Sequence, residues 1–233
     1  MKHSISFLLV NVLFVANIFC QDANNPIDPN PTVGIWNRFY SNDQSRLQVL
    51  ANVAYGRWFF RFTAEYEFNY GDANSPRFIF DSEPLKEENH FNSTNFLVAR
   101  LFQTRNGLHQ FGFGAIISHF HQRNFAGGVN FVSVSKLANQ WRFISLMTLQ
   151  GGKDIFTMEF QPGIYHDFNN GWYFRGHPRW LLNFETDVYE IPIGAGIGKI
   201  FSHGSPVVNV FFEPQYDVVG KVPMLYMGCK LLF

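Results

Sequence analysis

The feature of this sequence that most restricts its fold is the regular alternation of aromatic and polar residues in 57–70. One parity is apolar and largely aromatic: Trp58, Phe60, Phe62, Ala64, Tyr66, Phe68 and Tyr70. The other parity is polar or charged, apart from Phe59: Arg57, Arg61, Thr63, Glu65, Glu67 and Asn69. Because successive side chains of a strand point to opposite faces, this period of two predicts a β-strand. A face this aromatic is unusual in a soluble sandwich, so the pattern favours a strand whose outer face meets lipid.

The same alternation recurs from about residue 32 onward and predicts an all-β fold of about 12 strands. The predicted strands are 32–40, 46–54, 57–69, 94–104, 108–120, 125–136, 140–149, 155–167, 172–184, 188–200, 206–217 and 223–233. Most are close to the roughly 9–11 residues that a tilted membrane strand needs. The parity is mixed in 94–104, 125–136 and 140–149, so a barrel of 10 strands is the alternative.

The connections between these strands fit a transmembrane antiparallel up-and-down β-barrel. With a periplasmic N-terminus, the short turns face the periplasm, and the one long connection, 71–93, is extracellular. Trp58, Trp141 and Trp172 each open a strand just after a short turn, and with Phe233 they are the expected membrane-interface aromatics. Because an unpaired backbone group in hydrocarbon costs several kcal/mol, the strands must close into a barrel. The expected periplasmic turns are 55–56, 105–107, 137–139, 168–171 and 202–205.

The two ends of the chain indicate export and assembly in a membrane. Residues 1–20 have the basic start and apolar run of a signal peptide, which leaves 21–31 as a periplasmic segment and 32–233 as the barrel. Only Cys229 survives cleavage, so no internal disulfide is expected. The last strand ends on Phe233, which resembles the terminal signal read by the barrel-assembly machinery of outer membranes. Zero net charge argues against a nucleic-acid partner.

The inward parity of the predicted barrel carries charges of both signs. The expected lumen-lining residues are Arg57, Arg61, Glu65, Glu67, Glu159, Arg175, His177, Arg179, Glu213 and Asp217. These side chains could line an open channel that passes small solutes, or they could pair with one another and fill the interior of a small barrel. Because both signs are present, strong ion selectivity is not predicted.

Three motifs resemble catalytic, metal-binding or cofactor-binding sites, but none of them predicts a catalytic residue, a metal or a cofactor. His166 lacks the following serine that outer-membrane phospholipases and lipid A deacylases place near their histidine, so a lipid-modifying enzyme is the weaker alternative. His119 and His121 share one face of a strand without an acidic or cysteine partner. The glycines of 194–198 alternate with apolar residues and open no helix, so they are expected to allow curvature of the strand or to leave room for a large side chain opposite.

The C-terminal third resembles a known family. The motifs are Gly-Trp-Tyr-Phe-Arg-Gly-His-Pro-Arg-Trp at 171–180, Ile-Pro-Ile-Gly-Ala-Gly-Ile-Gly-Lys-Ile-Phe at 191–201, and Pro-Val-Val-Asn at 206–209. They resemble the end of Gram-negative outer-membrane proteins labelled transporter or neuromedin U, which are similar to barrels of a phenol-degradation pathway. The resemblance implies an outer-membrane barrel with a transport role and supplies no catalytic residue. We therefore expect a porin-like channel for small solutes in outer-membrane lipid, with a plugged structural or surface-binding barrel as the alternative.

Overall fold

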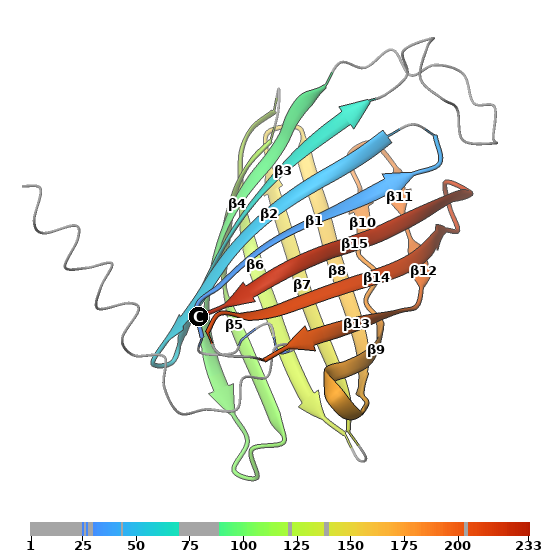
Figure 1. Ribbon diagram of the computed structural model, residues 1–233. Coiled ribbons are helices and arrows are strands. Elements are labelled where there is room, and N and C mark those ends of the chain that lie inside the picture. Colours follow the sequence, from blue (N-terminus) through green and yellow to red (C-terminus); the bar gives the residue numbers. More distant parts are fainter. Residues whose placement is uncertain are drawn as a thin grey trace, which may run out of the picture.

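The computed structural model forms one antiparallel sheet that curls into a barrel (Figure 1). It describes residues 25, 27, 30–42, 44–69, 89–120, 123–137, 140–202 and 205–233. The predicted signal peptide, 1–20, lies outside the described residues, as does most of the predicted long connection. The strands are β1 Thr32–Tyr40, β2 Gln44–Tyr55, β3 Trp58–Asn69, β4 His90–Gln103, β5 His109–Phe120, β6 Arg123–Lys136, β7 Trp141–Gly152, β8 Ile155–Asp167, β9 Trp172–Gly176, β10 Trp180–Asn183, β11 Val188–Glu190, β12 Pro192–Gly194, β13 Gly196–Phe201, β14 Val207–Asp217 and β15 Val222–Leu232.

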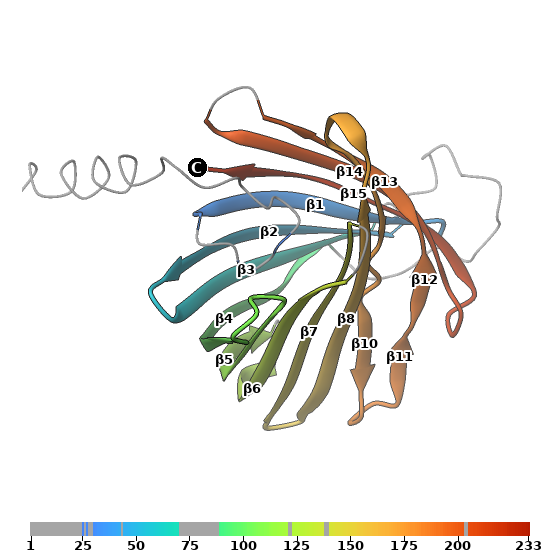
Figure 2. The ribbon, with the colours of Figure 1, turned by 90° about the horizontal axis from the view of Figure 1, so that it is seen from below.

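Fifteen strand segments make twelve strands of the barrel wall. β9 and β10 are two parts of one strand, and β11, β12 and β13 are three parts of the next. The wall closes where β15 pairs with β1, with Ile35 opposite Cys229, and where β8 pairs with both β9 and β10. Figure 2 shows the ring, with β10–β12 joining the β7–β8 wall to the β14–β15 wall. The prediction of twelve strands is confirmed, and ten is excluded.

The two faces of the wall follow the parity of the sequence. On β3, Glu65 and Glu67 are buried inside, whereas Phe62 is 44% exposed on the outside. The same holds on β5 and β6, where the outward Phe113 and Val129 are more than half exposed. None of the helical turns in the described part of the chain is long and apolar enough to cross a bilayer. An outer surface this apolar is costly in water, and hydrocarbon removes that cost.

Two predicted strands are interrupted, which corrects their predicted continuity. The strand predicted at 172–184 breaks between β9 and β10, where Pro178 has no backbone N–H to donate to a neighbouring strand. The strand predicted at 188–200 breaks on either side of β12. At the first of these breaks, Ile191 N donates to Asp217 Oδ1 (2.9 Å) instead of to a strand partner. β4 also begins at His90, so the predicted loop 71–93 ends earlier than expected.

One inward glycine of β13, Gly198, makes room for a large side chain opposite, which is one of the two roles expected of the glycines in 194–198; the other is curvature of the strand. Gly198 lies opposite Tyr173, and a Cβ at this glycine would overlap the tyrosine ring. Tyr173 is 1% exposed, and its hydroxyl donates to Asn209 Oδ1 at 2.6 Å. The bare backbone therefore lets a buried aromatic ring lie flat against the wall.

Replacing Gly198 by valine is expected to destabilise the barrel by about 1–3 kcal/mol, because the new side chain displaces the Tyr173 ring from its seat. Urea unfolding in detergent micelles, followed by the mobility shift of the folded barrel on a gel, measures the effect. Gly127→Val is the control, since a Cβ there meets only the carbonyl oxygen of Ile116 at 4.0 Å. Equal midpoints for the two variants would contradict this account of Gly198.

Candidate functional site

The barrel interior is polar and is the candidate functional site. Glu65, Glu67, Arg175, Arg179, Glu213 and Asp217 are buried there, and Arg61, Glu159 and His177 are half-buried. Arg57 instead lies in the exposed turn before β3, because that strand starts one residue later than the alternation suggested. We call the end of the barrel that carries the chain termini the inner end, and the opposite end the outer end (Figure 1).

Four charged interior residues were missed by the sequence analysis: Arg38, Arg46, Glu190 and Lys230. Arg38 lies on the inward parity of β1 and is 2% exposed, with its guanidinium carbon 4.2 Å from the centre of the Tyr226 ring. Extending the parity along β1, β2 and β15 would have identified Arg38, Arg46 and Lys230. Glu190 could not be found in this way, because β11 is only three residues long.

An ion-pair cluster crosses the lumen near its outer end. Arg46 on β2 bonds to Glu67 on the neighbouring β3 (3.1 Å) and to Glu190 on β11 (2.6 Å). Tyr40 also donates its hydroxyl proton to Glu190, at 2.8 Å. β1, β15 and β14 lie between β2 and the strand that contains β11, so the bond between Arg46 and Glu190 spans the interior.

A second arginine bridges the lumen from the break in the wall. Arg179 follows Pro178, and its Nη1 bonds to Glu65 on β3 across the barrel. Its Nη2 lies 2.7 Å from Glu159 on the neighbouring β8. Glu65 is held further by Asn92, whose side-chain nitrogen donates to it at 2.6 Å. Because five strands, β4–β8, separate β3 from β10, Arg179 links opposite walls.

A third cluster surrounds Glu213 on β14, which is fully buried. Its carboxylate accepts bonds from Arg175 Nε (2.5 Å), the His177 backbone N–H (2.9 Å) and Gln215 Nε2 (2.7 Å). The Arg175 guanidinium carbon also lies 3.7 Å from the centre of the Phe211 ring. A carboxylate with this many donors is well compensated for its burial.

The space inside the barrel is divided into cavities along its axis. The outer cavity, of about 330 Å³, is lined by residues of both arginine bridges, among them Arg46, Glu67, Glu190 and Arg179. A middle cavity of about 30 Å³ shares Asn95, Gln150 and Glu159 with the outer one. An inner cavity of about 70 Å³ shares only Arg61 with the middle one. The middle cavity therefore lies between the other two and has the smallest volume of the three.

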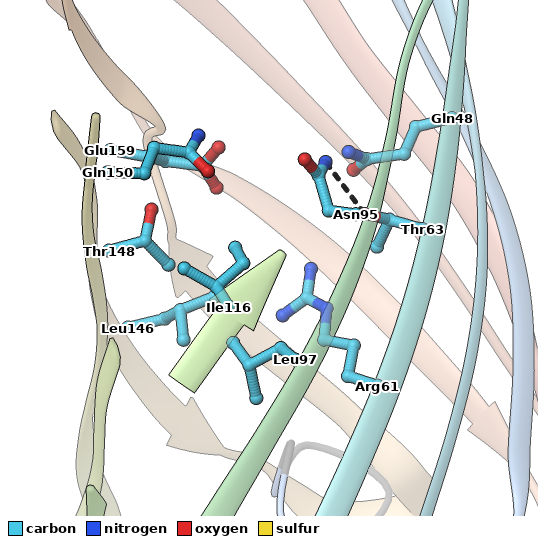
Figure 3. A pocket seen from close by; sticks show the side chains of 10 residues that line it. All are labelled: Gln48, Arg61, Thr63, Asn95, Leu97, Ile116, Leu146, Thr148, Gln150 and Glu159. Atoms are coloured by element: carbon cyan, nitrogen blue, oxygen red, sulfur yellow. Dashed lines mark hydrogen bonds between the residues drawn. The ribbon is translucent and has the colours of Figure 1, made fainter. Parts of the chain in front are cut away.

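Figure 3 shows the middle cavity. Arg61 extends from β3 into the space, and Gln150 and Glu159 stand on the opposite wall. Above Arg61 in this view, the Asn95 side-chain nitrogen donates to the Thr63 hydroxyl oxygen at 3.1 Å. Leu97, Ile116 and Leu146 supply an apolar side. A solute passing here would meet one guanidinium, three amides (Gln48, Asn95 and Gln150), the Glu159 carboxylate and a hydrocarbon surface at close range.

The segment before β1 reaches into the inner end of the barrel. Ile27 is 1% exposed and belongs to an apolar cluster with Phe59, Tyr173 and Phe211. Asn25 lines the inner cavity. Phe59, the one apolar residue on the polar parity of β3, is thereby explained: it faces inward at the inner end and packs in this cluster.

Aromatic side chains gather on the outside of the inner end. Trp58 and Trp172 are each 47% exposed at the starts of β3 and β9, and Trp141 starts β7. Phe233 directly follows β15, and its backbone N–H donates to the Pro31 carbonyl at 3.0 Å. The positions agree with one girdle at this end, and its contact with lipid remains a proposal.

The histidine motifs show no catalytic or metal-binding arrangement among the described residues. His166 is on the outward parity of β8, with its ring 4.5 Å from Trp141 and 5.1 Å from Phe168. His119 is exposed beside Phe125, and His121 lies outside the described residues. Within the part of the chain that is described, no group of three or more His, Cys, Asp or Glu side chains is placed to hold a metal ion.

Comparison with known proteins supports the fold. No family model and no curated protein matches the sequence. Among solved structures, the chain is similar to the KdgM porin (TM-score 0.57, 8% identity) and to the KdgM porin in complex with disordered oligogalacturonate (TM-score 0.56, 7% identity). Both alignments cover 87% of this chain and 99% of the porin. At this identity the likeness shows the fold alone, a closed antiparallel β-barrel.

Proposed function

We propose that the chain is a porin-like channel for small solutes in the outer membrane of a Gram-negative bacterium. The observation that carries the proposal is the reversal of polarity across one closed wall: aromatic side chains outside, ion-paired charges inside. In hydrocarbon only helices and edgeless sheets satisfy their backbone groups, and this sheet has no free edge among its described strands. The likeness to porins supports the same location.

The other roles of the chain follow from this proposal. Outer-membrane lipid surrounds the aromatic belt, and the barrel-assembly machinery recognises the C-terminal strand that β1 closes against. Residues 1–20 direct export, and the proposal gives the described residues no catalytic, cofactor-binding or nucleic-acid-binding role. We also propose that the chain is related to the transporter and neuromedin U family. The motifs in about the last 60 residues support this relationship.

The test is single-channel recording of the refolded protein in planar bilayers. We expect small, discrete conductance steps, because Arg46 and Arg179 cross the lumen and leave only narrow passages. Folding is checked independently by the gel-mobility shift and by β-type circular dichroism. A folded barrel that conducts neither as the wild type nor with Arg179 removed would refute the channel.

A plugged barrel with a structural or surface-binding role is the second candidate, favoured by the same two arginine bridges. Its binding surface would be the predicted loop 71–93, of which residues 71–88 lie outside the described part. Conductance recorded with and without that loop separates the candidates. A channel conducts in both forms, whereas a plugged barrel conducts in neither. A lipid-modifying enzyme is disfavoured by the outward position of His166, and wild-type hydrolysis of phospholipid micelles that His166→Ala abolishes would reinstate it.

A further inference from the structure

The interior charges are not equally available to a solute. Arg46, Arg175 and Arg179 each bond to one or two carboxylates. Arg38 is 2% exposed beneath the Tyr226 ring. Paired or covered charges contribute little to the field that a passing ion meets, because each is offset by its neighbour at short range.

Arg61 differs from these arginines. No hydrogen bond or ion pair to its guanidinium occurs within the described part of the chain. It is half-buried and lines both the middle and the inner cavity, the one residue that these two cavities share. A solute moving between them must therefore pass the Arg61 guanidinium.

The carboxylate nearest to this passage is already occupied. Glu159 lines the middle cavity opposite Arg61, but one of its oxygens bonds to Arg179 (2.7 Å) and the other accepts from Gln161. The described lining of the inner cavity contains no carboxylate, and its lysine and arginine side chains are Arg61, Lys230 and Arg175, the last of which bonds to Glu213. The outer cavity, by contrast, is lined by four carboxylates and two arginines. The Arg61 guanidinium, which has no bonded carboxylate in the described chain, thus lines the smallest of the three cavities, where an ion meets charge at close range.

We propose that Arg61 is the selectivity residue of this channel and gives it a preference for small anions, such as chloride and short carboxylates, over cations. The inference rests on the proposed channel function and deepens it. The sequence alone predicted no strong ion selectivity. The proposal departs from that expectation because no carboxylate of the described chain is bonded to Arg61, whereas Arg46, Arg175 and Arg179 are each bonded to at least one. The polar side chains beside it, Thr63 and Asn95, can bond to a carboxylate oxygen that Arg61 holds.

The experiment is the reversal potential of the full-length channel under a KCl gradient. The wild type is expected to favour chloride, and Arg61→Gln to lower the anion-to-cation permeability ratio roughly five-fold, as for one charge near 4 Å in a watery lumen. Arg61→Lys should keep the preference. Arg57→Gln is the matched control, an arginine four residues away in the exposed turn, and it should change nothing. Because the Arg61 guanidinium makes no hydrogen bond to another described residue, its replacement leaves no described group without a partner, and the variants should fold.

The outcomes separate the two proposals. An unchanged permeability ratio in Arg61→Gln, or a wild type that favours potassium, overturns the assignment of Arg61 and leaves the channel standing. Absence of conductance in the folded wild type and in the Arg179→Ala variant overturns the channel itself, and the selectivity residue with it. Loss of the anion preference in Arg61→Gln, with retention in Arg61→Lys and Arg57→Gln, supports the inference.

Discussion

Replacing Arg179 by alanine is expected to raise the single-channel conductance several-fold. The side chain leaves the wall at the break between β9 and β10 and bonds to Glu65 on the opposite side of the barrel. It therefore forms part of the floor of the outer cavity, which it also lines. Without the Arg179 guanidinium, we expect the 330 Å³ outer cavity and the middle cavity to join across the space that this group now fills.

The same replacement has an energetic cost that must be separated from the conductance. It leaves Glu65 and Glu159 without their arginine, and breaking a buried ion pair typically costs about 3–5 kcal/mol. Water entering the widened lumen reduces that cost, and Asn92 still donates to Glu65. Arg179→Lys is the informative companion, since one ammonium cannot hold two carboxylates in the fork geometry of a guanidinium. It should give an intermediate conductance, whereas Arg57→Ala should match the wild type.

A conductance in Arg179→Ala equal to that of the wild type, in protein shown to be folded, would mean that this arginine does not obstruct the permeation path. The wild type and Arg179→Ala are recorded in the same lipid and salt, so that a difference in conductance reflects the replacement. A larger pore should also pass larger neutral polymers, so the polymer size that blocks conductance gives a second, independent measure of the opening.

Removing one partner of the Arg175–Glu213 pair is expected to destabilise the barrel by about 3–5 kcal/mol, because the remaining charge stays buried without its counter-charge. Glu213 is completely buried and Arg175 is 4% exposed, so neither can turn toward water. The double variant Arg175→Met/Glu213→Leu should recover most of the loss, since two apolar side chains of similar size leave no uncompensated charge. Urea unfolding in micelles of the two single variants and the double variant gives the coupling energy directly.

Arg142→Ala is the control for that cycle. The ion pair of Arg142 with Asp167 is more exposed than the buried pair, at 15% and 29% of the two side chains. An exposed pair of this kind contributes roughly 0–1 kcal/mol. If the single variants at Arg175 and Glu213 lose no more than the Arg142 variant, the lumen around Glu213 is filled with water and the pair is not a structural element.

Sequence alternation predicted about twelve strands, with ten as the alternative, and it assigned the two faces of most of them. Strand direction and facing are local properties, because a period of two in side-chain orientation needs no knowledge of the neighbouring strands. The predicted strand 57–69 became β3 at Trp58–Asn69, and Phe62 faces outward while Glu65 faces inward. Even the exception, Phe59, kept the inward parity, although only the tertiary structure showed the apolar cluster that accounts for it.

Which of the inward charged side chains form ion pairs depends on the tertiary structure. Glu65 and Arg179 are 114 residues apart, and Arg46 and Glu190 are 144 apart. Their contact depends on the closure and tilt of the wall and on the break at Pro178, which turns Arg179 into the lumen. No local pattern encodes such a distance, because the curvature of a closed sheet is a sum over all of its strands. The pairing in turn decides which arginines are bonded to a carboxylate, as Arg46 and Arg179 are, and which are not, such as Arg61 within the described part of the chain.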